Sequence, residues 1–270
     1  MDLVHKIRKM KNLGDAQTYV KAAVKAQIRV VRLMRKQRVW RLTPDDMIRE
    51  LNAERLGEIR SRHGVENPGI FWPKYVEFER WFEKYIQRAE DIELDYGPKR
   101  RILDIGCGAG FFLRVCQKLG HDCAGMDYRE SHNEDEAALY AETTALFGLE
   151  RILWRIKRFV PLPDLGPPLD LVTAFMICFD EHYSETRWKA EEWNFFLDDI
   201  QSRLRPRGKI YLEMNRGMDN EFFHTGVREL FEKRGAIIDG YRVIFGVNKS
   251  RYYAVKRVLA NERRRHKPAQ

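Results

Sequence analysis

Residues 101–113 read Arg-Ile-Leu-Asp-Ile-Gly-Cys-Gly-Ala-Gly-Phe-Phe-Leu, a short apolar stretch followed by a glycine-rich turn. The first five residues predict a buried strand, and the residues from 110 onwards predict an amphipathic helix. Glycines let the chain turn sharply and let a ligand approach the main chain closely. The free N–H groups at the start of a helix favour a carboxylate or a phosphate. This stretch therefore predicts a ligand-binding turn between a strand and a helix.

The spacing of Gly106, Gly108 and Gly110 separates two kinds of ligand. A dinucleotide-binding turn follows the pattern GxGxxG. Here the third glycine comes one residue early, and Phe111 stands where that pattern has glycine. Close packing against a pyrophosphate is therefore disfavoured. Another Rossmann-like nucleotide domain, or a glycine turn without a ligand, is the alternative interpretation.

The pattern that runs from Asp104 to Gly110, Asp-x-Gly-x-Gly-x-Gly, closely resembles motif I of the class I S-adenosylmethionine-dependent methyltransferases. In that family the loop holds the methionine part of the cofactor. Residues 122–127 then end in Asp127, an acidic residue that can accept hydrogen bonds from both ribose hydroxyls. Residues 159–175 and 204–213 resemble later parts of the same family in the same order. The resemblance implies S-adenosyl-L-methionine as the cofactor.

The resemblance also implies a fold for roughly residues 100–257. It is an α/β, Rossmann-like methyltransferase fold with a central, mostly parallel seven-stranded sheet and helices on both faces. Alternating strand and helix patterns agree with such a sheet. We expect strands at residues 101–105, 122–127, 152–159, 170–176, 209–214, 236–247 and 251–258. We expect helices at residues 110–119, 134–147, 187–204 and 224–234.

The part of the chain before this domain has helical patterns. Residues 16–38 predict one helix, and Thr43, followed by proline and two aspartates, predicts the start of a second that runs to about residue 62. Aromatic residues between Tyr75 and Tyr85 predict a third helix, which either forms a lid with stacking surfaces for a sugar ring or covers the sheet. The predicted division of the chain is a helical extension (1–96), a methyltransferase domain (97–260) and a basic tail (261–270).

The positive charge of the chain is concentrated at one end. The chain has a formal net charge of +9, and residues 1–41 hold 12 Lys and Arg residues against Asp2 and Asp15. The remainder is therefore close to neutral. Three roles are open for this basic segment: attachment to an anionic membrane surface, binding of an acidic substrate or nucleic acid, and packing on a second subunit in a homodimer.

Cysteine usage and hydropathy indicate the compartment. The four cysteines, Cys107, Cys116, Cys123 and Cys178, form no CxxC pair and no zinc-ligand spacing, which predicts neither a disulfide framework nor a structural metal. The N-terminus carries charges at once, and no apolar stretch is long enough to span a bilayer. We expect a cytoplasmic protein, with association with the inner face of the membrane as one role of the basic segment.

The predicted site residues lie in or beside these motifs. Two aromatic residues, Tyr128 and Phe159, are candidates for flanking the adenine of the cofactor. The residues predicted to bind the cofactor are Asp104, Gly106, Cys107, Gly108, Gly110, Asp127, Tyr128, Phe159 and Met176.

Candidate catalytic residues follow the fourth and fifth expected strands, because ligands of open α/β sheets bind beyond the carboxyl ends of the strands. His182 has an ordinary pKa near neutrality and is a candidate general base, with Asp180 or Glu181 orienting its ring. Glu213, on a neighbouring strand, would approach the same place. A divalent cation held by these three acids is an alternative, but acids on loops are more often solvated, and we expect no metal.

The acceptor is constrained by what is missing after the fourth strand. The Asn/Asp-Pro-Pro-Tyr/Phe motif typical of exocyclic-amine DNA and RNA methyltransferases is replaced by Phe175-Met-Ile-Cys-Phe179, and no Pro-Cys dipeptide of a cytosine C5 enzyme is present. We expect O- or N-methylation of a small molecule or a glycan, and the pattern is similar to bacterial methyltransferases of polysaccharide pathways. An RNA-directed enzyme and a catalytically silent cofactor-binding subunit are the alternatives.

Overall fold

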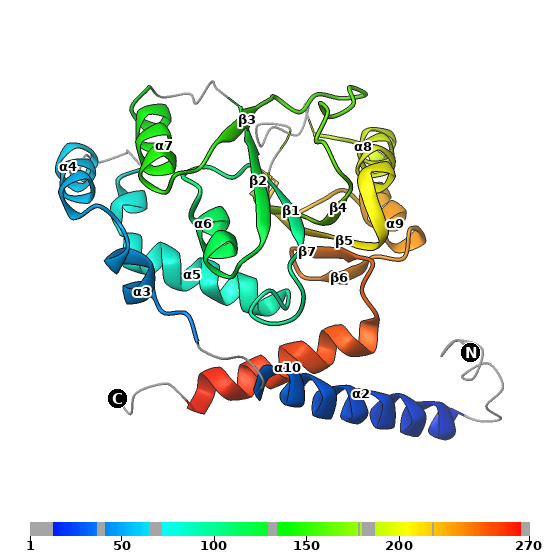
Figure 1. Cartoon of the computed structure of the whole chain (residues 1–270). Coiled ribbons are helices and arrows are strands. Elements are labelled where there is room, and N and C mark those ends of the chain that lie inside the picture. Colours follow the sequence, from blue (N-terminus) through cyan, green and yellow to red (C-terminus); the bar gives the residue numbers. More distant parts are fainter. Residues whose placement is uncertain are drawn as a thin grey trace. The chain divides into compact units, whose positions relative to one another are not determined.

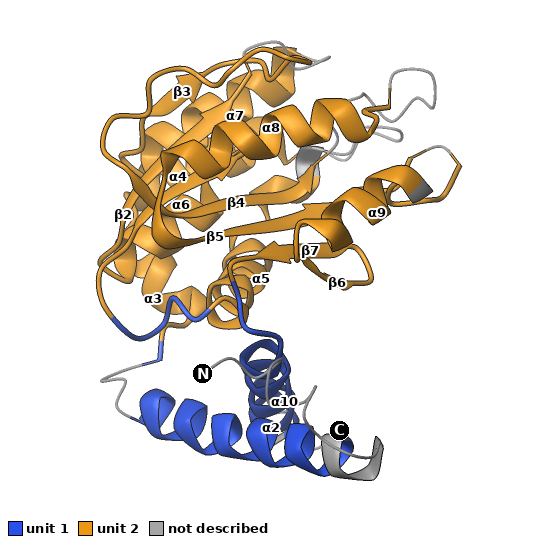
Figure 2. Ribbon diagram, turned by 90° about the vertical axis from the view of Figure 1, so that its right-hand side faces the viewer, with its two compact units in different colours: residues 1–41, 93–97, 247–270 blue, residues 42–92, 98–246 orange. Residues whose placement is uncertain are grey.

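The computed structural model describes residues 13–36, 41–64, 72–128, 134–177, 179, 187–217 and 219–265. The chain forms two compact units, which Figure 2 shows in different colours. One unit comprises residues 1–41, 93–97 and 247–270, and the other comprises residues 42–92 and 98–246. This division differs from the predicted 1–96, 97–260 and 261–270, because the first and last helices pack on each other.

Helices and strands follow one another along the chain as Figure 1 labels them. They are α2 (Leu13–Lys36), α3 (Pro44–Arg49), α4 (Ala53–His63), η1 (Trp72–Val76), α5 (Phe78–Asp91), β1 (Arg101–Ile105), α6 (Phe111–Lys118), β2 (Asp122–Asp127), α7 (Glu134–Leu146), β3 (Arg151–Leu153), β4 (Leu169–Ile177), α8 (Ala190–Arg203), β5 (Leu204–Met214), α9 (Thr225–Lys233), β6 (Ile237–Asp239), β7 (Arg242–Phe245) and α10 (Lys249–Arg265).

Seven strands of the described residues form one sheet in the order β3-β2-β1-β4-β5-β7-β6. Strands β1 to β5 run parallel to one another, whereas β7 is antiparallel to both β5 and β6. Parallel neighbours need crossover connections, and here helices supply them. Helices α5, α6 and α7 cover one face of the sheet, and α8 and α9 cover the other (Figure 1). The predicted Rossmann-like, mostly parallel seven-stranded sheet is confirmed.

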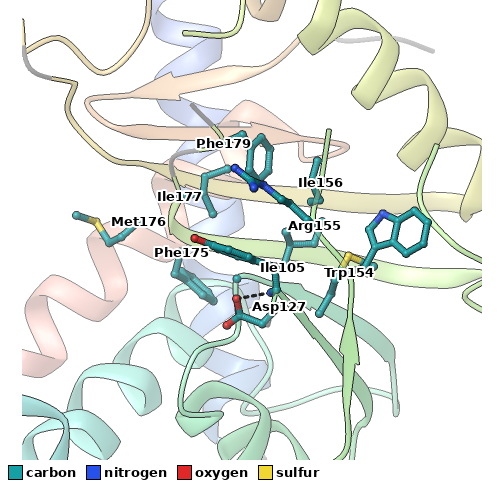
Figure 3. A pocket seen from close by; sticks show the side chains of 12 residues that line it. Ile105, Asp127, Trp154, Arg155, Ile156, Phe175, Met176, Ile177 and Phe179 are labelled. Carbon is teal, nitrogen blue, oxygen red and sulfur yellow. Dashed lines mark hydrogen bonds between the residues drawn. The ribbon is translucent and has the colours of Figure 1, made fainter. Parts of the chain in front are cut away.

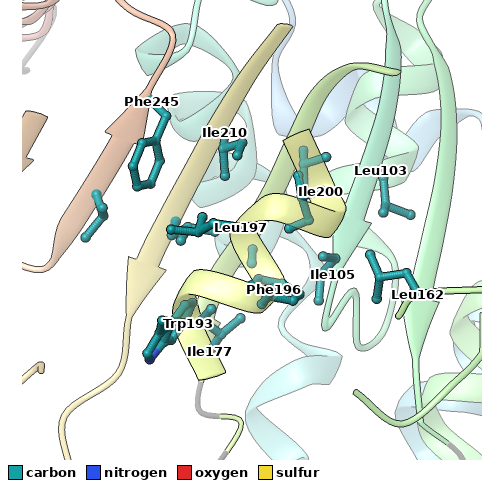
Figure 4. Packing of buried hydrophobic residues seen from close by; sticks show 14 of the residues in the cluster. Leu103, Ile105, Leu162, Ile177, Trp193, Phe196, Leu197, Ile200, Ile210 and Phe245 are labelled. Atoms are coloured by element: carbon teal, nitrogen blue, oxygen red, sulfur yellow. The ribbon is translucent and has the colours of Figure 1, made fainter. Parts of the chain in front are cut away.

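On the face of the sheet that α8 covers, the core is formed by one apolar stripe of α8 whose residues lie at helical spacing. The stripe meets apolar side chains of the central strands, among them Ile105 and Ile210 (Figure 4). All of these residues are almost completely buried, and each buried side chain of this size contributes about 1.5–3 kcal/mol to folding. The stripe consists of Trp193, Phe196, Leu197 and Ile200.

Four predicted elements differ from the structure. Residues 251–258, predicted as a strand, lie in α10, while residues 236–247 contain both β6 and β7. The strand predicted at 152–159 ends at Leu153. The helix predicted to run from Thr43 to about residue 62 is interrupted between α3 and α4, where the Asn52 side chain accepts a hydrogen bond of 2.9 Å from the N–H of Arg55 and starts a new helix.

The unit that contains α2 and α10 is a pair of packed helices. Val31 of α2 is buried in a cluster with apolar residues of α10. Arg35 of α2 is also buried and pairs with Asp95 at 2.8 Å and with Glu262. The other basic residues of α2 are exposed. No helix of the described residues is long and apolar enough to cross a membrane.

Candidate functional site

The glycine-rich turn after β1 has a backbone that other residues rarely adopt. The φ angles of Gly106, Gly108 and Gly110 are 68°, 52° and 81°, in the left-handed region that is costly for residues with a Cβ atom. A Cβ atom on Gly110 would also lie 2.8 Å from Leu149 and 3.1 Å from Thr144. Glycine is therefore required here both for the turn and for close packing against the end of α7.

The carboxylate of Asp127, at the end of β2, holds this turn. Its Oδ2 atom accepts a hydrogen bond of 2.6 Å from the N–H of Gly108, and its Oδ1 atom accepts one of 2.8 Å from the N–H of Tyr128. Burial is the largest influence on the pKa of Asp127 and raises it, while the two N–H donors act in the opposite direction. The end of β2 and the turn after β1 thus form one connected structure.

Two cavities meet at this point. The first has a volume of about 220 Å³ and the second a volume of about 530 Å³. Four residues line both cavities: Gly106, Asp127, Phe175 and Met176. These residues lie at the carboxyl ends of β1, β2 and β4, which is where open α/β sheets bind ligands.

The first cavity has a mainly apolar wall (Figure 3). Trp154 and Ile156 come from the segment after β3, and Ile177 comes from the end of β4. The guanidinium of Arg155 lies 5.5 Å from the ring centroid of Tyr128. This wall of flat and branched side chains suits an aromatic base.

The second cavity has an aromatic and basic wall supplied by η1 and α5. The ring centroids of Tyr75 and Trp81 lie 4.7 Å apart, and the ring of Tyr85 is parallel to that of Phe111 at 6.3 Å. The same lining includes three basic side chains, Lys74, Lys84 and Arg88. Asn215, which follows β5, completes the wall on the sheet side.

Helix α5 serves as cover and as cavity wall at once. Phe78 and Phe82 are completely buried and pack edge-on against Phe111 of α6, as predicted for a helix that covers the sheet. Trp81 and Tyr85, on a neighbouring stripe of the same helix, line the second cavity. One face of α5 therefore covers the sheet and a neighbouring face forms cavity wall, while a lid for a sugar ring stays a prediction.

The structure brings most of the residues predicted for the cofactor to these cavities. Gly106, Cys107, Gly108, Asp127, Tyr128 and Met176 each line at least one of them. Asp104 and Gly110 lie outside both linings. The fully buried carboxyl of Asp104 accepts a 2.7 Å hydrogen bond from the Thr173 hydroxyl, and burial raises its pKa to about 7. Asp104 therefore sits within the sheet beneath the turn.

The prediction for Phe159 is corrected by the structure. Phe159 is 55% exposed, packs edge-on against Phe195 and lines neither cavity. The reason is the early end of β3 at Leu153. Because the strand is short, the residues that reach the first cavity are Trp154 to Ile156.

The catalytic role predicted for Glu213 does not agree with its surroundings. Its side chain is only 1% exposed and lines neither cavity. One carboxylate oxygen accepts a hydrogen bond from Arg88, and the other accepts one of 3.2 Å from Nε of Arg242. Arg242 also pairs with Asp91 at 3.2 Å. Glu213 is thus the centre of a buried ion-pair network.

The remaining catalytic candidates, Asp180, Glu181 and His182, lie outside the described residues, as does Cys178. Within the part of the chain that the structure does describe, no group of three or more His, Cys, Asp or Glu residues is arranged to hold a metal ion.

The basic residues of the second cavity were not predicted from the sequence. Lys84 and Arg88 lie four residues apart, so α5 presents them on one face. The sequence pattern that could have indicated them is the pair of cations, Lys84 and Arg88, beside the aromatic stripe of α5. By itself such a pair is more often a solvated face, and only the neighbouring glycine turn makes it part of a site.

A family model described as a methyltransferase domain matches residues 75–233, more than half of the chain. The matched span contains α5, the glycine-rich turn, Asp127 and the first five strands. A search of curated proteins found no match.

Many solved structures are similar in part. They include precorrin-6y C5,15-methyltransferase from Geobacter metallireducens, with 13% identity over 65% of this chain and 78% of that chain and a TM-score of 0.39. An amino pentose methyltransferase from Micromonospora echinaspora has 20% identity over 55% and 58%, with a TM-score of 0.37. The PH0226 protein from Pyrococcus horikoshii has 20% identity over 67% and 81%, with a TM-score of 0.36. Because these TM-scores are low, the similarities say nothing about the acceptor of this chain.

Proposed function

The chain belongs to the methyltransferase domain family and is an S-adenosylmethionine-dependent methyltransferase; we propose that it methylates an oxygen or nitrogen atom of a small molecule or a glycan. The observation that supports this acceptor class is the second cavity. Its volume of about 530 Å³ lies within the range of small-ligand sites, and aromatic rings form much of its wall. Aromatic faces of this kind suit a sugar ring or another compact ring.

The residues present fit the cofactor. Both oxygens of Asp127 accept main-chain N–H groups, but a carboxylate has about four acceptor positions, so it can still accept hydrogen bonds from ribose hydroxyls. The apolar first cavity, with Tyr128 and Trp154, would hold the adenine. The glycine-rich turn borders both cavities through Gly106 and would hold the methionine part.

The chemistry divides between the cofactor and the protein. S-adenosylmethionine supplies a methyl group that is already activated on a sulfonium sulfur, so positioning of the acceptor provides much of the catalysis. The acceptor would occupy the second cavity, against Tyr75, Trp81 and Tyr85. In this proposal, donor and acceptor would meet at the four residues that line both cavities. A hydroxyl acceptor also has to lose a proton, and His182 remains the candidate base.

The test is transfer of an isotope-labelled methyl group by the full chain. Labelled S-adenosylmethionine is offered with separate panels of saccharides, aromatic small molecules and total RNA. We expect label in a saccharide or small-molecule panel and none in RNA. Label in RNA would support the RNA-directed alternative, and cofactor binding without transfer to any panel would support the silent-subunit alternative. Either outcome would overturn the proposal.

A further inference from the structure

The second cavity contains a lysine whose charge is not balanced within the described fold. Lys84 of α5 lines the cavity, and its ammonium lies 4.6 Å from the ring centroid of Trp81. Within the described part of the chain, no carboxylate forms an ion pair with Lys84. The side chain is exposed at the cavity wall, so a ligand can reach it.

The neighbouring arginine has a different environment. Arg88, one turn further along α5, is buried and forms an ion pair with Glu213. Its guanidinium also lies 4.9 Å from the ring centroid of Tyr85 and 4.4 Å from that of Phe175. The charge of Arg88 is therefore compensated by the protein itself, whereas the charge of Lys84 remains available.

A second ammonium group lines the same cavity. Lys74 of η1 is exposed, and its Nζ atom lies 5.1 Å from the ring centroid of Tyr75. Among the described residues of the lining, the only acidic one is Asp127, whose oxygens already accept two main-chain N–H groups. The α5 and η1 side of the cavity thus carries the ammonium groups of Lys74 and Lys84 beside the compensated guanidinium of Arg88.

The surroundings of Lys84 disfavour its positive charge when no anion is bound beside it. Partial desolvation and then the Arg88 charge lower the pKa of Lys84 to about 8. The charges of Lys74 and Arg80 also lower this pKa, whereas the charge of Glu213 raises it. An anion bound beside Lys84 would offset this repulsion. Charge-assisted hydrogen bonds are about twice as strong as neutral ones, and partial exclusion of water increases their strength.

We propose that Lys84, supported by Lys74, binds a carboxylate or phosphate group of the methyl acceptor. The acceptor would then be an acidic small molecule, such as a sugar acid or a sugar phosphate, whose ring lies against the aromatic wall. This inference rests on the proposed function and specifies its substrate class. It assigns Lys84 to acceptor binding and not to the binding of the cofactor.

Ligand binding tests the proposal without turnover. Isothermal titration measures the affinity of the full chain, saturated with S-adenosylhomocysteine, for glucuronate, glucose 6-phosphate, inorganic phosphate and glucose. We expect at least one of the anions to bind tenfold or more tightly than glucose, and the two sugar anions to distinguish carboxylate from phosphate. Equal affinities for the anions and for glucose would overturn the proposal.

Variants locate the binding to one side chain. Lys84→Met should weaken anion binding tenfold or more, while Lys84→Arg should keep most of it. Lys233→Met, an exposed lysine of α9, is the matched control and should leave it unchanged. Anion binding that survives Lys84→Met would overturn the proposal.

A second titration excludes the cofactor's own carboxylate as the partner of Lys84. S-adenosylhomocysteine carries that carboxylate, and 5′-methylthioadenosine lacks it. Lys84→Met should change the affinity for neither. If it weakens only S-adenosylhomocysteine, Lys84 binds the cofactor and the proposal is wrong. Methyl transfer to neutral sugars alone would likewise overturn it while leaving the proposed function intact.

Discussion

The main-chain nitrogen of Gly108 lies 2.6 Å from Oδ2 of Asp127. This hydrogen bond joins the turn after β1 to the end of β2 at the place where the two cavities meet. The same carboxylate that would accept the ribose hydroxyls therefore also holds the turn in its left-handed conformation. Under the proposed role of Asp127, cofactor binding and the shape of the turn would be coupled through one side chain.

Asp127→Asn should weaken binding of S-adenosylhomocysteine roughly tenfold to a hundredfold. An amide accepts weaker hydrogen bonds than a carboxylate and has only one oxygen for the Gly108 and Tyr128 donors. Isothermal titration measures the change, and circular dichroism verifies folding. An affinity equal to that of the unaltered protein would show that Asp127 holds the turn only.

Tyr128→Ala should weaken binding of S-adenosylhomocysteine about tenfold, because it removes an aromatic wall of the first cavity. Phe159→Ala is the matched control and should leave the affinity unchanged, since Phe159 lines neither cavity. Both affinities can be measured by titration. A loss in Phe159→Ala as large as that in Tyr128→Ala would restore the adenine contact first predicted for Phe159.

Gly110→Ala should lower the free energy of unfolding by about 1–3 kcal/mol, because the residue has a φ of 81° and a Cβ atom would contact Leu149. The control is Gly57→Ala in α4, where no atom lies within 4 Å of the added Cβ. There we expect stabilisation of about 0.5–1 kcal/mol, because alanine favours a helix. Urea unfolding measures both. Equal effects in the two variants would contradict the strained turn.

Glu213→Gln should lower the free energy of unfolding by about 3 kcal/mol, because it leaves Arg88 and Arg242 with an uncharged partner in the interior. Glu232→Gln removes an exposed pair with Arg228 and should cost less than about 0.5 kcal/mol. Urea unfolding compares the two. Unchanged stability combined with lost methyl transfer would return Glu213 to a catalytic role.

Asp104 should make stability fall as the pH rises. Its pKa is about 7 in the folded protein and near 3.8 in the unfolded chain, so between these values the folded state holds more protons. Stability from this group is present below about pH 4 and is lost as the pH rises to about 7. In the Asp104→Asn variant, the side chain at position 104 does not titrate in this pH range.

The free energy of unfolding of Asp104→Asn, minus that of the unaltered protein, should therefore increase as the pH rises over this range. The increase is at most about 1.4 kcal/mol per pH unit, and the difference becomes constant above the range. Urea unfolding at several pH values measures the difference. A constant difference across the range would show that Asp104 ionises normally.

One failed prediction shows the limit of local patterns. Residues 251–258 contain Tyr252, Tyr253, Val255 and Val258, which favour a strand by propensity. They form α10 instead, because residues three and four apart, such as Val255, Val258 and Leu259, pack together around Val31 of α2. This helical spacing is local, but the partner that buries these residues lies far away in the sequence and could not be predicted from it.

The glycine-rich turn, Asp127 and the strand and helix spacing around them were determined by the sequence alone. Their physical basis is local: left-handed backbone at Gly106, Gly108 and Gly110 requires glycine, and a strand places its last residue at the edge of the sheet. The surroundings of Glu213, Phe159 and Lys84 were decided only by the tertiary structure. Each depends on which charges and cavities distant segments bring to the side chain, and burial and charge balance arise only when those segments pack together.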